Sequence, residues 1–353
     1  MKRILYSKDI QHRLSFVESV YSRLIKAGLV DNIAYLLPKK FMAEVSQHFP
    51  GCTFQAYEDV VKSNTLFNLD TERTLLVLDR PARYKNITSN TFVRLSRLTA
   101  KFRHRMLVDI VPFTASIEYL YAPLAFVDRS ILGYQHGYAF RENNWEITEA
   151  NDPVRAHDIG LLARKLAPVA DIDYSDLLGN QVEIVHAPLT RGEAAEYEQK
   201  RDELFITENS ERPVITRLAD WTNIRESRYE RLQSLLSTLP GNTVIYTNLS
   251  GHNKRLLKRF PGLKVKSFYD ANGTEDQYDQ VVLFELPIVK GYLFLDVIAN
   301  VRPDCRVMVF RSNTTVDDML AKDLFDQYEQ INQLAQALHK EVHNERRQKD
   351  VSQ

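Results

Sequence analysis

The sequence lacks the features that mark several large classes of protein. Its 353 residues include only two cysteines, Cys52 and Cys305, which lie far apart and fit neither a metal-binding spacing nor a disulfide framework. No apolar run reaches the length of a membrane-spanning helix, and the first residues lack the apolar core of a signal peptide. We therefore expect a cytoplasmic protein from a reducing compartment, with no membrane as a partner.

An excess of charge of either sign is also missing, because 46 lysine and arginine residues balance 46 aspartate and glutamate residues. No net field draws the chain to nucleic acid, so any basic surface must be local. The nine histidines show no HExxH or other zinc-ligand spacing, and no nucleophile motif of the Gly-x-Ser-x-Gly type occurs. The sequence predicts no metal site and no bound cofactor.

Two parts of the chain alternate short apolar runs with amphipathic helical patterns. The runs cover residues 3–7, 32–38, 74–79 and 106–111 in the first part, and 242–248, 264–269, 280–286 and 305–311 in the second. A helical pattern with Leu14, Val17, Val20 and Leu24 on one face follows the first run, and Gly28 ends it. This alternation predicts an α/β fold with parallel sheets covered by helices.

Between these two parts the composition changes. Residues from about 116 to 204 have a helical and mixed character without apolar strand runs, and residues 206–223 resemble a connector. We therefore expect a first lobe over residues 1–133 and a helical middle segment with its connector over 134–220. A second lobe over 221–335 and a polar C-terminal tail over 336–353 complete the expected organisation.

Residues 83–133 contain a series of short segments in a distinctive order. They read YKN at 84–86, a serine at 89, RLSRL at 94–98, a proline at 112, IEYLYAPLAFVD at 117–128 and ILG at 131–133. In order and spacing they resemble the Swi/Snf-type branch of superfamily 2 helicases and translocases. Residues 161–169, 182–204, 244–260 and 305–320 resemble later segments of the same family. The resemblance implies two RecA-like parallel-sheet lobes joined by a helical middle segment.

Hydrolysis of ATP by that family needs four chemical parts, and the first two are incomplete here. A phosphate-binding loop needs glycine and a lysine, but no glycine occurs between Met1 and Ala27. The Asp-Glu-x-His box keeps Asp79, whereas Arg80 and Ala82 stand where the resemblance implies glutamate and histidine. A guanidinium cannot act as a base and repels magnesium.

The other two parts are missing as well. Residues 108–112 read VDIVP where the resemblance implies a Thr-Gly-Thr-Pro coupling turn. Residues 292–304 contain Arg302 as their only arginine, where the resemblance implies a pair that stabilises the γ-phosphate. The loss of all four parts together indicates a degenerate member that keeps the fold, and such a compact chain suggests a phage or mobile-element origin.

The favoured hypothesis is a non-catalytic, DNA-associated scaffold or a partner subunit of an active helicase or replication protein. Lys8, Arg13 and Asp79 are then the remnant of a nucleotide site, although Asp79 is also typical of a structural turn. A second hypothesis is an atypical ATPase in which Lys8 or Arg13 replaces the loop lysine and Asp109 or Glu118 supplies the carboxylate. A third is a protein-interaction module without nucleic-acid contact.

Two basic segments are the candidates for nucleic-acid contact. Residues 80–108 hold eight lysine and arginine residues and no acid, and residues 250–260 form a basic helical pattern after a predicted strand end. The candidate residues are Arg83, Lys85, Asn86, Arg94, Arg97, Lys101, Arg103, Arg105, Thr247, Asn248, Lys254, Arg255 and Lys258. Two interpretations explain this pattern. The cations contact phosphates, or they form a solvated helix face and pair with acids elsewhere in the fold; the sequence does not distinguish the two.

Overall fold

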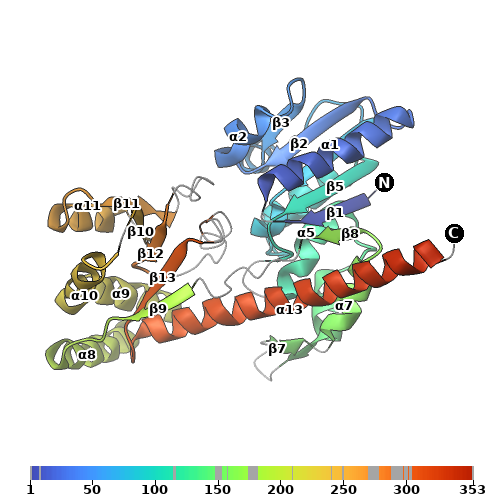
Figure 1. Ribbon diagram of the computed structural model, residues 1–353. Helices are drawn as coiled ribbons and strands as arrows, with labels where there is room; N and C mark the ends of the chain where they lie inside the picture. Colours follow the sequence, from blue (N-terminus) through green and yellow to red (C-terminus); the bar gives the residue numbers. More distant parts are fainter. Residues whose placement is uncertain are drawn as a thin grey trace. The chain divides into compact units, whose positions relative to one another are not determined.

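The computed structural model describes residues 2–7, 9–113, 117–147, 153–156, 158–173, 182–208, 210–239, 241–248, 250–268, 278–287, 297, 301 and 304–351. The chain divides into two compact units, Met1–Asp176 with Glu329–Gln353, and Leu177–Tyr328. Each unit contains a parallel sheet with helices (Figure 1). The predicted α/β class with two parallel-sheet lobes is confirmed.

The sheet of the first unit has six parallel strands in the order β3-β2-β4-β5-β1-β8. The strands are β1 (Lys2–Tyr6), β2 (Asn32–Leu37), β3 (Thr53–Ala56), β4 (Thr74–Asp79), β5 (His104–Asp109) and β8 (Ala170–Ile172). The helices are α1 (Ile10–Lys26), α2 (Met42–Ser46), α3 (Tyr57–Ser63), α4 (Asn90–Thr99), α5 (Tyr121–Val127), α6 (Gly137–Asn144) and α7 (Ile159–Leu166). Short 3-10 turns cover Lys39–Phe41, Pro81–Arg83 and Ile117–Leu120, and β6 (Trp145–Ile147) pairs with β7 (Pro153–Ala156) as a separate hairpin.

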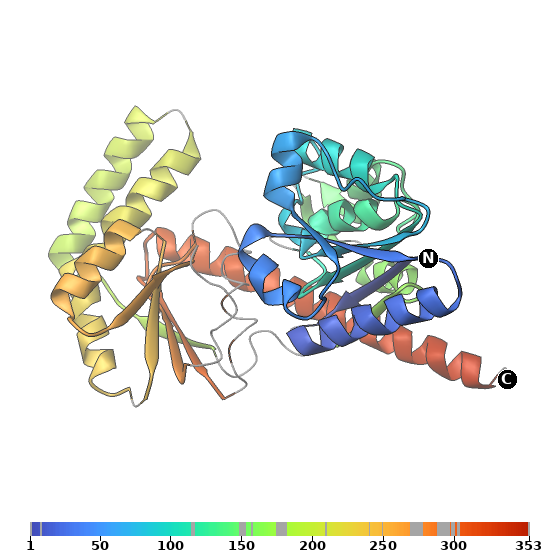
Figure 2. The same cartoon turned by 90° about the horizontal axis from the view of Figure 1, so that it is seen from above.

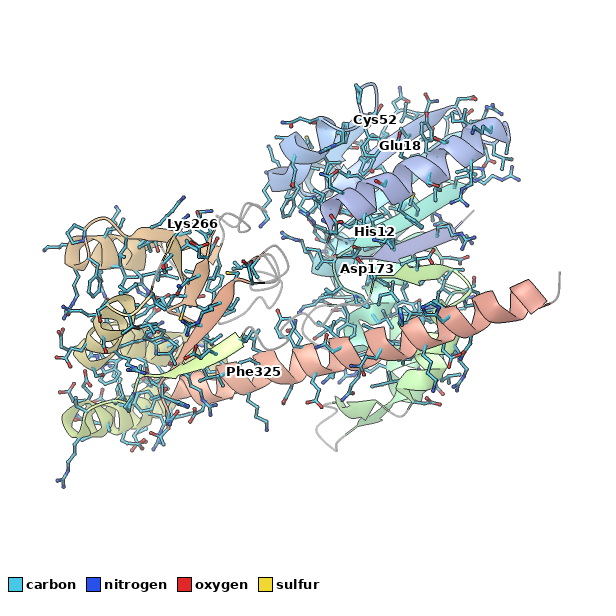
Figure 3. All side chains as sticks on the ribbon, viewed as in Figure 1. His12, Glu18, Cys52, Asp173, Lys266 and Phe325 are labelled. Carbon is cyan, nitrogen blue, oxygen red and sulfur yellow. The ribbon has the colours of Figure 1, made fainter. Side chains whose placement is uncertain are left out.

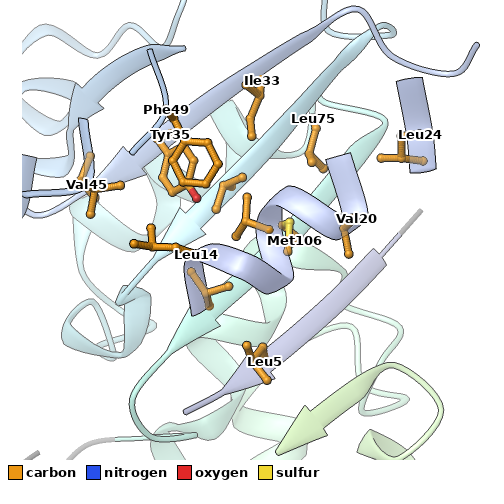
Figure 4. Close-up of a cluster of buried hydrophobic side chains, with 14 of the residues drawn as sticks. Leu5, Leu14, Val20, Leu24, Ile33, Tyr35, Val45, Phe49, Leu75 and Met106 are labelled. Atoms are coloured by element: carbon orange, nitrogen blue, oxygen red, sulfur yellow. The ribbon is translucent and has the colours of Figure 1, made fainter. Parts of the chain in front are cut away.

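The core of this unit forms where the apolar face of α1 packs on the sheet, whose central strand β4 is buried throughout. Asp9 caps the helix by accepting a hydrogen bond from the Gln11 N–H, and Gly28 ends it with a φ of 66°. Figure 4 shows the cluster that α1 buries against β1, β2, β4 and β5, including Leu14, Val20, Leu24, Ile33, Leu75 and Met106. The uniform burial of β4 explains its uninterrupted apolar sequence.

The sheet of the second unit has five parallel strands in the order β11-β10-β12-β13-β9. These are β9 (Val182–His186), β10 (Thr243–Thr247), β11 (Lys264–Ser267), β12 (Gln280–Leu283) and β13 (Arg306–Arg311). The helices of this unit are α8 (Arg191–Thr207), α9 (Glu211–Asn223), α10 (Glu226–Leu236) and α11 (Ser250–Arg259). Helices α8 and α9 pack along each other as a hairpin (Figure 2).

The middle of the chain differs from the expected helical character. Residues 170–172 form β8 at the edge of the first sheet, and residues 182–186 form β9 at the edge of the second. Both strands are short and carry polar residues, so no apolar run marks them. The expected connector over 206–223 is mostly helix α9, and Pro213 is tolerated because it lies in the first turn. The other segment boundaries stay a prediction.

The last helix, α13 (Val316–Val351), is 36 residues long. Its buried residues recur every three or four positions and include Leu324, Tyr328, Ile331, Leu334, Leu338 and Val342. Leu338 and Val342 continue this apolar stripe beyond residue 336, in the segment for which the sequence predicts a polar tail. In the described parts of the chain, no helix has both the length and the apolar character needed to span a membrane.

Candidate functional site

The carboxyl ends of β1, β4 and β5 meet at one edge of the first sheet, where ligands of open α/β sheets bind. Ser7, Asp79, Arg80 and Asp109 follow or end these strands, and all four are buried. The Ser7 hydroxyl donates to Asp173 at 3.1 Å, and His12 lies 3.5 Å from the same carboxylate (Figure 3). Ser7 and His12 thus both contact Asp173 at the turn after β1, where the resemblance implies a phosphate-binding loop.

Arg80 is the decisive residue of this edge. Its backbone has a φ of 55° and a ψ of 46°, the left-handed conformation that is unusual for a residue other than glycine. This conformation turns the side chain into the protein, where the guanidinium carbon lies 3.4 Å from the centroid of the Phe41 ring. The Arg80 Nε is 3.7 Å from the Asp79 carboxylate. A buried cation thus neutralises the aspartate that the resemblance assigns to magnesium.

Arg13 supplies a second buried cation from α1. It donates to the Ser7 carbonyl oxygen at 2.5 Å. Burial and the nearby Arg80 lower the pKa of Arg13 to about 10, against the opposite effect of Asp79, Asp109 and Glu44. The structure thus brings Arg13 and Asp79 together with Arg80 and Asp109 in a buried ion cluster. Lys8, the third predicted residue, lies outside the described residues.

Asp109 has a structural task at this edge. Its two oxygens accept hydrogen bonds from the backbone N–H groups of Ala82 at 3.0 Å and Ile110 at 2.7 Å. Burial raises the pKa of Asp109 to about 6, although these hydrogen bonds oppose the shift. The carboxylate that the atypical-ATPase hypothesis needs is therefore engaged with the turn after β4. The side chain of Glu118, its alternative, lies outside the described residues.

The raised pKa of Asp109 predicts a pH-dependent stability of the first unit. The contribution of this carboxyl group is fully present below its ordinary pKa and is lost as the pH rises through about 6. We expect a loss of about 3 kcal/mol in the free energy of unfolding from this group. Urea unfolding across this pH range measures the free energy of unfolding of the wild type and of Asp109→Asn. The difference between the two proteins should change with pH, and Asp70→Asn is the exposed control. Parallel pH profiles of wild type and Asp109→Asn would contradict it.

Most cations of the predicted basic run have partners inside the first unit. Arg94 donates to the Val61 carbonyl oxygen and Arg97 to the Asn64 side-chain oxygen, each at 2.9 Å. Both acceptors lie at the end of α3, which explains why arginines three positions apart share this face. Arg103 pairs with Glu72 at 3.3 Å, and Arg105 donates to the Phe126 carbonyl oxygen at 3.3 Å.

The remaining candidates of this run differ in their surroundings. Arg83 lies 5.5 Å from the centroid of the Phe41 ring, and Lys85 lies 4.7 Å from the centroid of the Tyr119 ring. Asn86 accepts hydrogen bonds from Thr88, and Lys101 is exposed. The contacts of these cations with oxygen atoms and aromatic rings of the same unit favour a structural task for most of the run. Contact of these residues with nucleic acid stays a prediction.

A second polar cluster lies at the carboxyl ends of β10 and β12. Thr247 is buried and donates to the Asn253 side-chain oxygen. The Asn248 N–H donates to the Glu285 Oε2 at 2.7 Å, and the Asn248 side-chain nitrogen donates to the Leu286 carbonyl oxygen at 2.6 Å. Thr247 and Asn248 thus organise the strand end and do not form an open surface.

The cluster contains two residues that the sequence analysis did not select. The Glu285 carboxylate is buried, and its Oε1 lies 2.5 Å from the His252 Nδ1. The acid at the end of an apolar run and the histidine among basic residues were the only signals in the sequence, and neither has a distinctive spacing. On the same helix, Leu256 is buried, whereas the side chain of Leu257 is 42% exposed.

The outer face of α11 is an open basic surface in the second unit. Lys254, Arg255 and Lys258 are exposed on this helix. In the described part of the chain, none of the three forms a hydrogen bond or salt bridge. Arg259 differs because it pairs with Glu226 and lies 5.0 Å from the centroid of the Tyr229 ring. We name Lys254, Arg255 and Lys258 the α11 basic face.

No protein-family model matches this chain, and no curated protein matches it. Among solved structures, the chain is similar to the Sulfolobus solfataricus SWI2/SNF2 ATPase core in complex with double-stranded DNA. The identity is 12% and the TM-score 0.42, with 96% of this chain and 89% of that chain covered.

Two further structures are similar at the same level. The Sulfolobus solfataricus SWI2/SNF2 ATPase core domain gives 14% identity and a TM-score of 0.41, covering 92% of this chain and 84% of that chain. The Pyrococcus furiosus Hef helicase domain gives 12% identity and a TM-score of 0.41, covering 91% of this chain and 94% of that chain.

Proposed function

We propose that this chain is a non-catalytic, helicase-like protein that contacts nucleic acid without hydrolysing a nucleotide. The observation that carries the proposal is the buried guanidinium of Arg80 beside Asp79. Metal-assisted phosphoryl transfer needs an anionic strand end and a group that orients water. Arg80 supplies a permanent positive charge and no proton acceptor at that position.

The neighbouring residues support the same conclusion. Arg13 donates a hydrogen bond to the Ser7 carbonyl oxygen, in the turn after β1. This interaction engages the Arg13 guanidinium inside the protein. Asp109 is bound to two backbone N–H groups and has a pKa raised to about 6 by burial. At this edge of the sheet, Arg80 lies beside Asp79, while Arg13 and Asp109 are hydrogen-bonded to the backbone.

The α11 basic face is the surface that we propose for the nucleic acid. Its three cations are exposed, and the buried Leu256 fixes the helix against its sheet. Cations at adjacent turns of one helix suit the repeated charges of a phosphate backbone, which they neutralise with release of counterions. DNA is the proposed class of partner, with the chain as a scaffold or a partner subunit of a replication or translocase complex.

Replacing the α11 basic face by alanine is expected to weaken DNA binding without unfolding the protein. For Lys254→Ala, Arg255→Ala and Lys258→Ala together, the slope of log affinity against log salt should become shallower by roughly 3, about one unit per lost contact. Fluorescence anisotropy with a short duplex and a short single strand measures it. The matched control removes three cations of α8, as Arg191→Ala, Lys200→Ala and Arg201→Ala.

The following results would overturn parts of the proposal. DNA-stimulated ATP turnover by the purified protein, or heat from titration with ATP and magnesium, would contradict the non-catalytic part. An unchanged salt slope in the α11 triple variant would contradict the assignment of the surface. Loss of DNA binding in the α8 control to the same extent would show that net charge alone, and no particular face, is responsible.

A further inference from the structure

A single buried carboxylate joins two elements beneath the α11 basic face. Glu285 follows β12, and its side chain is 1% exposed. Its Oε2 accepts the Asn248 N–H at the end of β10, and its Oε1 contacts the His252 imidazole in the first turn of α11. The start of α11 is therefore tied to the sheet edge through one acid.

The charge state of His252 decides the strength of this tie. With the imidazole protonated, the contact is a charge-assisted hydrogen bond, roughly twice as strong as a neutral one. The groups that act on His252 in the described residues are Glu285 after β12, Asp220 of α9 and Arg255 of α11 itself. The Glu285 hydrogen bond raises the pKa of His252, and Asp220 adds to this, whereas burial and Arg255 oppose it.

The same carboxylate also interacts with the helix that carries the basic face. A carboxylate near a helix N-terminus is favourable because the first N–H groups carry partial positive charge. Burial disfavours the charged carboxylate of Asp220, which itself lies near both His252 and Glu285 and has a raised pKa. When the imidazole loses its proton, Glu285 and Asp220 lose a nearby positive charge that offsets their mutual repulsion.

We propose that Glu285 and protonated His252 are positioning residues that hold the α11 basic face in its nucleic-acid-binding orientation, so that binding weakens as the pH rises. This rests on the proposed function of the same face. Neither residue needs to touch the nucleic acid, because both act through the start of the helix that carries Lys254, Arg255 and Lys258. The ligand is a phosphate backbone, and the regulation is by proton release from one imidazole.

The test compares DNA affinity at constant ionic strength on both sides of the ordinary histidine pKa, from about pH 6 to about pH 8.5. For the wild type and a short fluorescent duplex, we expect the dissociation constant to rise roughly fivefold over this range. His252→Gln should bind weakly at every pH, and Glu285→Gln should flatten the profile. The control is His186→Gln in the same unit, where the histidine is exposed and bonds to Asn313, and it should keep the wild-type profile.

Hydrogen–deuterium exchange separates this inference from the proposed function. In the free protein, the backbone of the first turn of α11 should lose protection with rising pH beyond the intrinsic increase in exchange, and His252→Gln should start from the low value. If this occurs while the wild type binds no DNA at any pH, the proposed function is wrong and the positioning stands. If DNA binds with a flat pH profile and the protection does not change, the positioning is overturned and the proposed function stands.

Discussion

Arg228→Met is expected to destabilise the second unit by about 3–5 kcal/mol. Arg228 lies in α10 and is fully buried. Its Nη1 donates to the Asp317 carboxylate at 2.5 Å and to the Ser312 hydroxyl at 3.0 Å, and its Nε and Nη2 donate to the Phe284 carbonyl oxygen. One side chain thereby joins α10, the end of β12 and the start of α13.

The size of this effect follows from what remains after the substitution. Asp317 is also buried, and its carboxylate keeps the hydrogen bond from the Ser312 N–H at 3.0 Å, a neutral donor. Methionine fills a similar volume but leaves this negative charge without a cation in a low-dielectric surrounding. The Phe284 carbonyl oxygen loses its guanidinium donors at the same time.

Urea unfolding of the second unit measures the loss, and two further variants test its cause. Arg231→Met lies one turn away on the same helix, where the arginine is exposed and donates to the His186 carbonyl oxygen, and should cost less than about 1 kcal/mol. The double variant Arg228→Met with Asp317→Leu should recover much of the loss because no buried charge remains. A single variant as stable as the wild type would contradict the importance of this ion pair.

Much of the fold was predictable because local pattern and burial agree. The uninterrupted apolar runs at β4 and β12 are buried strands of parallel sheets, and Leu14, Val17, Val20 and Leu24 line the buried face of α1. Edge strands were not predictable for the opposite reason. β8 and β9 each pair on one side only and include polar residues, so their periodicity resembles that of the helical segments around them.

The candidate site also has features that the sequence predicts and features that it does not. That Arg80 stands beside Asp79 is visible in the sequence, and it predicted an edge unsuited to magnesium. The ring of Phe41 under Arg80 comes from another part of the chain, and the pairing of His252 with Glu285 joins residues 33 positions apart. The sequence also does not distinguish the buried Arg228 from the exposed Arg231 of the same helix, since both lie in one polar stretch. Such pairings depend on tertiary packing, for which a single sequence has no periodic signal.

Arg80→Gly is expected to destabilise the first unit by about 2–4 kcal/mol, even though glycine suits the backbone at this position. The substitution relieves a left-handed conformation that costs an L-residue about 1–2 kcal/mol. It also removes the cation beside Asp79 and the stacking on Phe41, leaving Arg13 as the remaining cation of the buried cluster. The free energy lost by removing one partner from a buried charge cluster is larger than the free energy gained by relieving the backbone strain.

Chemical unfolding of the first unit checks this, with Arg103→Gly as a comparison because Arg103 pairs with Glu72 at the surface. If Arg80→Gly is as stable as the wild type or more so, the ion cluster does not stabilise the sheet edge.

Thermal unfolding with ATP and magnesium gives a second, independent readout. No rise in the midpoint is expected for either protein, because without Arg80 the edge still lacks a glycine-rich turn and a free base. A nucleotide-dependent rise in Arg80→Gly alone would show that this one guanidinium closes an otherwise intact nucleotide site, and that the other three losses are not decisive.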